Sequence, residues 1–343
     1  MVYIPPNFEP ATVPEDEAYE GTELDDAVKA VLPECTIKWV ATYGASFWAI
    51  SSKIDTILPD GTEQSYFLKV YTAEKAERMA LGEYEGSKAL YASLPDNIPR
   101  PIAAGPLANN SRRHFYPAEF RSMDDNMPGT TEFASVVAKL HESTESPNGM
   151  FGFHIRTFGG DFPVNTSWAA TWEEFFTRLM RDTMEKERAV QGPNDELDRL
   201  SPLILNHVIP RLLRPMESNG RKVKPVLLHG DLWHGNVAVD ADTKEPVLYD
   251  PCAFYGHSEY EFAPWRAARY RTNRCHVQEY FKILDGKITE PMEDQDDRHA
   301  LYAMRNNLMV SSSWVANKQT RQLAIEEMQR LVGKYCETKT TNT

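Results

Sequence analysis

Two lobes of α+β architecture are predicted by the way hydrophobic residues repeat along this 343-residue chain. Between residues 37 and 71, apolar side chains alternate with polar ones or form short runs, which is typical of strands. After residue 131, apolar side chains recur every three or four positions, which is typical of amphipathic helices. We therefore expect a small β-rich N-terminal lobe with one main helix, followed by a larger and mainly helical C-terminal lobe.

The boundaries follow from breaks in these patterns. Residues 1–22 are rich in proline and acidic residues, so we expect a loose arm. The N-terminal lobe then covers residues 23–122 and starts with a short helix over residues 24–32. A polar stretch at residues 122–130, with Pro128-Gly129, separates it from the C-terminal lobe at 123–343.

A lysine inside a strand is the unusual feature of the N-terminal lobe. A hairpin is predicted over residues 37–50, whose tip either covers phosphate groups or is an ordinary turn. The next strand, residues 66–71, carries Lys69 between apolar neighbours, where a half-buried cation needs an anion. The helix predicted over residues 73–94 offers several glutamates, of which we favour Glu83. In the alternative, the glutamates are solvated and Lys69 extends from an edge strand into solvent.

The C-terminal lobe is expected to be built from helices. They are predicted over residues 131–143, 168–190, 195–218, 294–317 and 319–337, the third one kinked or broken near Pro202 and Pro210. The aromatic residues of the second helix are assigned to the core. The glycine-rich and aromatic loop at residues 150–162 either lines a substrate pocket or packs as a plug.

The residues that carry chemistry lie in two stretches, 226–236 and 246–250. An apolar run leads into His229-Gly230-Asp231, Asn236 follows, and a second apolar run ends in Asp250. Phosphoryl transfer to a hydroxyl needs a carboxylate that accepts the proton, and oxygen ligands that hold Mg²⁺ against the nucleotide. Asp231 suits the first role, and Asn236 with Asp250 suits the second.

Protein kinases place an Asp and an Asn at the same interval and take a metal-binding Asp from the next hairpin. The predicted fold is therefore protein-kinase-like, with ATP and Mg²⁺ as cofactors. The strand predicted at residues 113–120 would lead into a hinge at Glu119, Phe120 and Met123 that offers backbone groups to adenine. Gly230 stands where protein kinases have an arginine, which favours a small-molecule kinase.

An alternative assigns the same stretch to a metal centre. His229, Asp231 and His234 are residue types that bind zinc or iron. This reading gives no role to Asn236 or Asp250, so the kinase interpretation is preferred.

Composition narrows the classes of partner. The chain has 41% hydrophobic and 25% charged residues, and its net charge of −13 disfavours nucleic acid and anionic membranes as partners. Its four cysteines lack the close spacing of a metal knuckle or disulfide framework, which favours a reducing compartment. The N-terminus does not look like a signal peptide, and no stretch reads as a membrane span. We expect a cytoplasmic protein.

With these residues placed, the chain resembles the fructosamine kinase, or ketosamine 3-kinase, family, whose fold is that of the aminoglycoside phosphotransferases. The resemblance extends from about Trp39 to Leu331. It is carried by residues 67–70, Gly82-Glu83, residues 151–154 and 172–176, the stretch from His229 to Asn236, Tyr249-Asp250-Pro251 and residues 254–259.

The resemblance implies ATP-dependent phosphorylation of the 3-hydroxyl of ketosamines. These are fructosamine or ribulosamine adducts, either free or on protein lysines, and the labile product decays to restore the amine. Lys69 and Glu83 match the pair that positions the phosphates, and Trp233 matches a residue expected to pack on the sugar. By the same resemblance, Asp231 is the base, and Asn236 and Asp250 are the metal ligands.

Residues 262–269 depart from the commonest form of the family, which leaves the substrate open. Two other functions therefore remain. One is another small-molecule kinase of this fold, acting on an amino alcohol or an aminoglycoside, against which the Leu232-Trp233 pair argues. The other is a binding protein without catalysis, which would not need all four of the residues Lys69, Asp231, Asn236 and Asp250.

Overall fold

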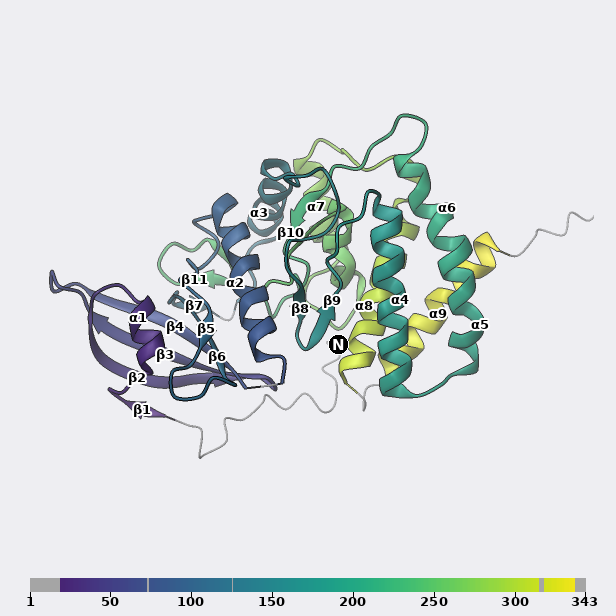
Figure 1. Ribbon diagram of the computed structural model, residues 1–343. Helices are drawn as coiled ribbons and strands as arrows, with labels where there is room; N and C mark the ends of the chain where they lie inside the picture. The colour runs from purple at the N-terminus through teal and green to yellow at the C-terminus, as the bar shows by residue number, and fades with distance from the viewer. Residues whose placement is uncertain (1–18, 73, 125, 315–317, 337–343) are drawn as a thin grey trace, which may run out of the picture.

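The computed structural model describes residues 19–72, 74–124, 126–314 and 318–336. Figure 1 shows a β-rich N-terminal lobe beside a larger helical lobe, so the predicted two-lobed α+β fold is present. Residues 1–18 of the predicted arm lie outside the described residues. The end of that arm is not loose, because Glu20–Gly21 form strand β1 and pair with β2.

The N-terminal lobe is built on one antiparallel sheet in the order β1-β2-β3-β4-β6-β5. The hairpin of β2 (Thr36–Ala45) and β3 (Ala49–Ile57) is the predicted one, and β4 (Glu63–Tyr71) carries Lys69 in the middle of the sheet rather than on an edge. The short β5 (Gly105–Pro106) and β6 (His114–Glu119) complete the sheet.

The two helices of this lobe cover opposite faces of the sheet. Because side chains alternate along a strand, Tyr66 and Leu68 of β4 pack in one apolar cluster with Val28 of α1 (Asp26–Val31). Tyr71 packs in another cluster with Met79 of α2 (Ala76–Ser93). Lys69 has the same parity as Tyr71 and therefore faces α2, which lies between the sheet and the C-terminal lobe in Figure 1.

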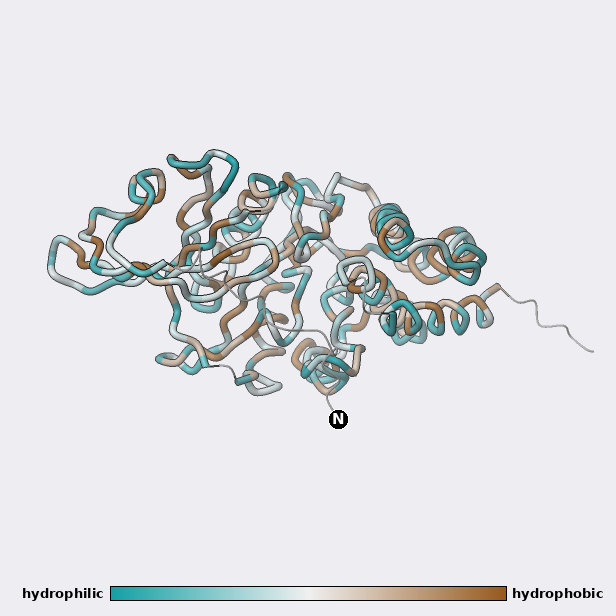
Figure 2. Tube along the Cα trace, turned by 90° about the horizontal axis from the view of Figure 1, so that it is seen from below, coloured by the Kyte–Doolittle hydropathy of each residue, from teal (hydrophilic) through white to brown (hydrophobic). Residues whose placement is uncertain are grey.

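The helices of the C-terminal lobe surround one large apolar core. Figure 2 shows hydrophobic and hydrophilic residues alternating along them, as expected of amphipathic helices. The described helices include α3 (Thr130–Ser143), α4 (Trp172–Gln191), α5 (Asp195–Leu203), α6 (Ile209–Leu213), α7 (Arg274–Ile283), α8 (Gln295–Ser313) and α9 (Lys318–Tyr335). The expected break near Pro202 and Pro210 is a π-helical turn at Ile204–Val208 between α5 and α6.

Several elements of this lobe were not predicted. Helix α7 and the 3-10 turns at Ser258–Arg266 come after Asp250 in the chain. The loop at residues 150–162 contributes a small hairpin of β8 (Thr157–Gly159) and β9 (Phe162–Val164). Short strands frame the catalytic residues. β10 (Val226–Leu228) pairs with β13 (Phe254–Gly256), and β11 (Val237–Asp240) lies between β12 (Pro246–Leu248) and β7 (Met123–Asp124).

Candidate active site

The ammonium group of Lys69 is shared by two carboxylates. Its Nζ lies 2.9 Å from Glu83 Oε2 on α2 and 2.9 Å from Asp250 Oδ1 in the C-terminal lobe. Burial acts to lower the pKa of Lys69, but Asp250 and Glu83 outweigh it, so that pKa is raised and the lysine stays charged. The Tyr71 hydroxyl also donates a hydrogen bond to Glu83, a contact that the sequence did not suggest.

Two glycines bring α2 close enough for this arrangement. A Cβ atom on Gly82 would lie 2.7 Å from the carbonyl oxygen of Arg156, and one on Gly86 would lie 3.2 Å from the Cβ of Ala253. The helix backbone therefore rests directly on the C-terminal lobe on both sides of Glu83. Of the other glutamates in that stretch, Glu85 bonds His154, whereas Glu74 and Glu77 are exposed.

The predicted catalytic loop, residues 229–236, begins directly after β10 with a turn that requires glycine. Gly230 has a φ of +79°, and a Cβ atom there would lie 2.2 Å from the carbonyl oxygen of Cys252. The arginine that protein kinases carry here would therefore strain this turn. His229 is buried, and its Nε2 lies 2.9 Å from the carbonyl oxygen of Tyr249. It therefore connects this loop to the stretch that ends at Asp250.

A buried carboxylate that sequence reasoning missed holds this loop in place. Glu261, 1% exposed, accepts hydrogen bonds from the backbone N–H groups of His229 at 2.7 Å and Gly230 at 2.9 Å. Burial acts to raise the pKa of Glu261, but bonding to His141 and the backbone outweighs it, so that pKa is lowered. Glu261 thus fixes the residues directly before Asp231.

Asp231 is the predicted general base. The Asn236 side chain donates to its carbonyl oxygen at 2.8 Å and to its Oδ2 at 3.3 Å. Burial raises the pKa of Asp231 to about 7, Asp250 adds to this effect, and Arg305 opposes it. A carboxylate with a pKa raised in this way is a stronger proton acceptor than a solvated one.

Asp250 directs its Oδ1 atom toward the ammonium group of Lys69. Its backbone is in the left-handed conformation, with a φ of +56°. Such a conformation is uncommon outside glycine and is found disproportionately at functional sites. Its side chain keeps 46% exposure. Burial acts to raise the pKa of Asp250, but Lys69 outweighs it, so that pKa is lowered and the group is anionic.

The residues present fit a magnesium ion. Because Asn236 commits its amide nitrogen to Asp231, its amide oxygen remains as the ligand atom, and Asp250 supplies a carboxylate oxygen. Mg²⁺ is commonly held by only one or two protein side chains together with waters and substrate phosphates. Within the described ranges, no group of three or more His, Cys, Asp and Glu side chains is arranged to hold a metal.

Two of the predicted hinge residues, Glu119 and Phe120, use their backbone N–H groups in hydrogen bonds within the N-terminal lobe. The backbone N–H of Glu119 donates to the Arg100 carbonyl at 2.9 Å, and that of Phe120 donates to the Ser65 carbonyl at 3.3 Å. These two residues can therefore offer carbonyl oxygens to a base, but not N–H groups. Met123 lies in β7, opposite Asp240 of β11, at the start of the C-terminal lobe.

Trp233, within the predicted catalytic loop, packs in a cluster of rings with His234 and Tyr270. Its ring centroid lies 5.4 Å from that of Tyr270 and 4.9 Å from that of His234. The indole folds over Gly235, where a Cβ atom would lie 2.4 Å from the ring. Trp233 is half-buried, so part of the ring surface remains available to a ligand.

These features agree with the comparison to known proteins. A model of the family described as fructosamine kinase matches residues 51–329, which is most of the chain. The chain belongs to the fructosamine kinase family. A chloroplastic protein-ribulosamine 3-kinase of Oryza sativa subsp. indica is 32% identical over 245 residues, covering 71% of this chain and 67% of the relative. The ketosamine-3-kinase of Mus musculus is 31% identical over 224 residues, covering 57% and 68%.

Solved structures show that this fructosamine kinase family member has the kinase-like fold. A structure described as a fructosamine-3-kinase of Thermobifida fusca matches with a TM-score of 0.71 and 18% identity, covering 91% of this chain and all of that one. An aminoglycoside phosphotransferase in complex with AMP-PNP and hygromycin B matches with a TM-score of 0.56 and 14% identity, covering 90% and 98%. At these identities the likeness shows the fold alone.

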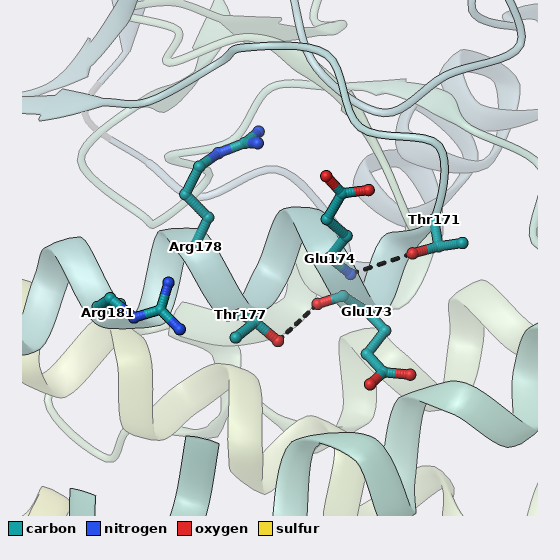
Figure 3. A pocket seen from close by; sticks show the side chains of 6 residues that line it. All are labelled: Thr171, Glu173, Glu174, Thr177, Arg178 and Arg181. Carbon is teal, nitrogen blue, oxygen red and sulfur yellow. Dashed lines mark hydrogen bonds between the residues drawn. The ribbon is translucent and has the colours of Figure 1, made fainter. Parts of the chain in front are cut away.

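A surface hollow lies at the start of α4, and the predicted site residues do not line it. Figure 3 shows it along the first turns of α4, and its lining residues are Thr171, Glu173, Glu174, Thr177, Arg178 and Arg181. The hydroxyl of Thr171 accepts from the Glu174 N–H and that of Thr177 donates to the Glu173 carbonyl, so both serve the helix. We assign the hollow no function.

Searching the described part of the chain for a helix long and apolar enough to cross a membrane gives none.

Proposed function

We propose that this chain is an ATP-dependent kinase that phosphorylates the 3-hydroxyl of ketosamines. The observation that carries the proposal is the convergence of Lys69, Glu83, Asp231, Asn236 and Asp250 from both lobes in a member of the fructosamine kinase family. The relatives named as ketosamine or ribulosamine 3-kinases support this choice of acceptor.

In this proposal, Asp231 orients the acceptor hydroxyl and takes its proton as the phosphoryl group is transferred. Its raised pKa suits that role, because a base works best when its pKa lies near the working pH. Asn236 and Glu261 keep the base in place, the first by bonding Asp231 itself and the second by fixing the two preceding residues.

The nucleotide is assigned to the face formed by Lys69, Asp250 and the hinge. Lys69 would hold the phosphates while Glu83 keeps its ammonium in position, and the carbonyl oxygens of Glu119 or Phe120, with Met123 nearby, would contact adenine. Asn236 and Asp250 would hold Mg²⁺, which neutralises charge on the phosphates and orients the γ-phosphoryl group.

The acceptor is assigned to the side of Trp233, whose ring would pack on the C–H groups of the sugar. Either a free ketosamine or a glycated protein lysine presents the same sugar, so we propose both as substrates and deglycation as the outcome. The expected place of action is the cytoplasm.

The experiment compares acceptors side by side on the purified protein with MgATP. We expect ADP release with N-fructosyl-lysine and N-ribulosyl-lysine, and a product phosphorylated at C3 by mass spectrometry and phosphorus NMR. A higher kcat/KM with choline or kanamycin would transfer the assignment to another small-molecule kinase. ATP binding without ADP release on any of these acceptors would favour a binding protein.

A further inference from the structure

An arginine-rich segment borders the ring cluster of Trp233. Four arginines lie between residues 266 and 274, although the whole chain carries a net charge of −13. They fall in and just after residues 262–269, where the sequence departs from the commonest form of the family. The local charge is thus opposite to that of the protein as a whole, which would favour an anion at this place.

This segment is attached to the catalytic loop at three points. The indole N–H of Trp265 donates to the carbonyl oxygen of Leu232 at 2.6 Å, and the ring of Tyr270 contacts that of Trp233. The backbone N–H of residue 271 donates to the His234 ring at 3.3 Å. The position of the segment relative to Asp231 is therefore fixed by the fold.

Arg269 is the buried cation of this segment. Its side chain is 9% exposed, and its guanidinium lies 4.5 Å from the centre of the Tyr270 ring. One nitrogen, Nη1, donates to Asn307 Oδ1 at 2.7 Å. In the part of the chain that the structure describes, its buried Nε and Nη2 atoms have no hydrogen-bond partner.

Comparison with the buried Arg298 shows which kind of partner Arg269 lacks among the described residues. Arg298 is fully buried and bonds both carboxylate oxygens of Glu259 at 2.9 Å. Among the residues that the structure describes, Arg269 bonds the neutral Asn307 and no carboxylate. Arg305, on the same helix as Asn307, likewise has only uncharged partners and one unpartnered nitrogen, Nη2, among the described residues.

Burying a cation without an anion is costly, and native proteins normally pair it. Donor groups that are buried and unpartnered are also rare, and each one calls for a water, an ion or a ligand. A planar guanidinium with two free N–H positions matches an oxyanion, which it can bind through parallel hydrogen bonds. Arg269 has this chemistry one aromatic ring away from Trp233.

We propose that Arg269 determines specificity by binding an oxyanion carried by the acceptor. The proposal rests on the proposed ketosamine kinase function and narrows its substrate to ketosamines with a negatively charged group. That group is either the carboxylate of a glycated free amino acid or a phosphate ester on the sugar. Both present oxygens that the Nε and Nη2 atoms of Arg269 can bind.

The nucleotide is a less suitable partner for Arg269. The groups proposed to bind the phosphates are Lys69 of β4 and, through Mg²⁺, Asp250, and these two side chains bond each other. Arg269 instead connects to Tyr270 and through it to Trp233, the residue assigned to the sugar. The oxyanion is therefore assigned to the acceptor side of Asp231.

The test uses three acceptors built on the same fructosylated glycine: the carboxylate N-fructosylglycine, its neutral amide N-fructosylglycinamide, and the 6-phosphate of that amide. We expect the unaltered protein to show a kcat/KM about ten- to a hundred-fold higher for the carboxylate or the phosphate than for the neutral amide. Whichever charged acceptor is preferred identifies the source of the oxyanion. Equal values for all three would overturn the proposal.

Arg269→Gln should remove that preference by raising KM for the charged acceptor, while kcat/KM for the neutral amide stays within about two-fold. A preference that survives this change would contradict the role of Arg269. The matched control is Arg266→Gln in the same segment, since Arg266 pairs with the exposed Asp296 and should leave the preference intact. If the glutamine variant does not fold, Arg269→Lys replaces it in the test. This variant keeps the positive charge and should retain part of the preference.

Calorimetric binding of the same acceptors separates this proposal from the kinase assignment. If no acceptor is phosphorylated, the proposed function fails, yet tighter binding of a charged acceptor that Arg269→Gln abolishes would still support the oxyanion site. If all three are phosphorylated and bound alike, the kinase assignment stands and the oxyanion site is wrong.

Discussion

The phosphate side and the acceptor side of the site satisfy their charged groups in opposite ways. On the phosphate side, Lys69 has two carboxylate partners, and Glu83 has both Lys69 and Tyr71. On the acceptor side, Arg269 contacts only an amide and a ring and keeps two unpartnered donor atoms among the described residues. The first half thus pairs its charges with one another, whereas the second half offers Arg269 no anion among the described residues.

In the proposed assignment, the first half carries the chemistry common to such kinases and the second half selects the substrate. A preorganised group of charges lowers the barrier for phosphoryl transfer whatever the acceptor is. An unpartnered buried donor costs free energy until the right ligand arrives, so it discriminates strongly between ligands. Changes on the phosphate side should therefore affect ATP use and rate but leave acceptor KM unchanged.

The largest effect is expected at Asp231, where the two halves meet. Asp231→Asn keeps the shape but loses basicity, so kcat should fall by about 10²- to 10⁴-fold with ATP affinity unchanged. Steady-state kinetics with calorimetric ATP binding measures both. A variant that works at the parent rate would show that this loop is only scaffold.

The next effect concerns the metal ligands. Asp250→Ala removes a half-exposed carboxylate, so the fold should survive while kcat/KM falls by about a hundred-fold or more. An excess of chelator should have the same effect on the unaltered protein, and added Mg²⁺ should restore activity. Full turnover in chelator would rule out the assignment of Asn236 and Asp250.

A smaller effect is expected where α2 rests on the C-terminal lobe. In Gly82→Ala the new methyl group would lie 2.7 Å from a backbone oxygen, so it should destabilise the protein by about 1–3 kcal/mol and raise KM for ATP. Gly333→Ala is the control, because Gly333 lies in α9 with open space around it and should gain about 0.5–1 kcal/mol. Thermal unfolding and ATP kinetics compare the two, and equal stability changes would contradict the close contact.

The smallest effect is expected at Tyr71. Tyr71→Phe removes only the hydroxyl that bonds Glu83, so kcat/KM for ATP should fall by a factor of about five, equivalent to about 1 kcal/mol. Tyr66→Phe is the matched control on the opposite face of β4 and should leave ATP kinetics unchanged. If KM for the ketosamine rises instead, the two halves of the site are not independent.

Much of the phosphate side was predictable from the sequence because its signals are local. Lys69 sits in an apolar strand, and the structure contains its ion pair with Glu83. The contact between Lys69 and Asp250 was not predicted, since it joins residues 181 positions apart. Glu261 was missed because nothing in its neighbourhood distinguishes it from Glu259, which bonds Arg298 instead.

Taken alone, the sequence determined the two-lobed α+β architecture, the family, and the interval between Asp231 and Asn236. These depend on side-chain periodicity and on short turns, in which neighbouring residues constrain one another. Only the tertiary structure decided which carboxylates meet Lys69, which acid holds the catalytic loop, and that Arg269 meets Asn307 rather than an anion among the described residues. Such pairings depend on how distant segments pack, because the free energy of a buried charge is set by whatever groups the fold places around it.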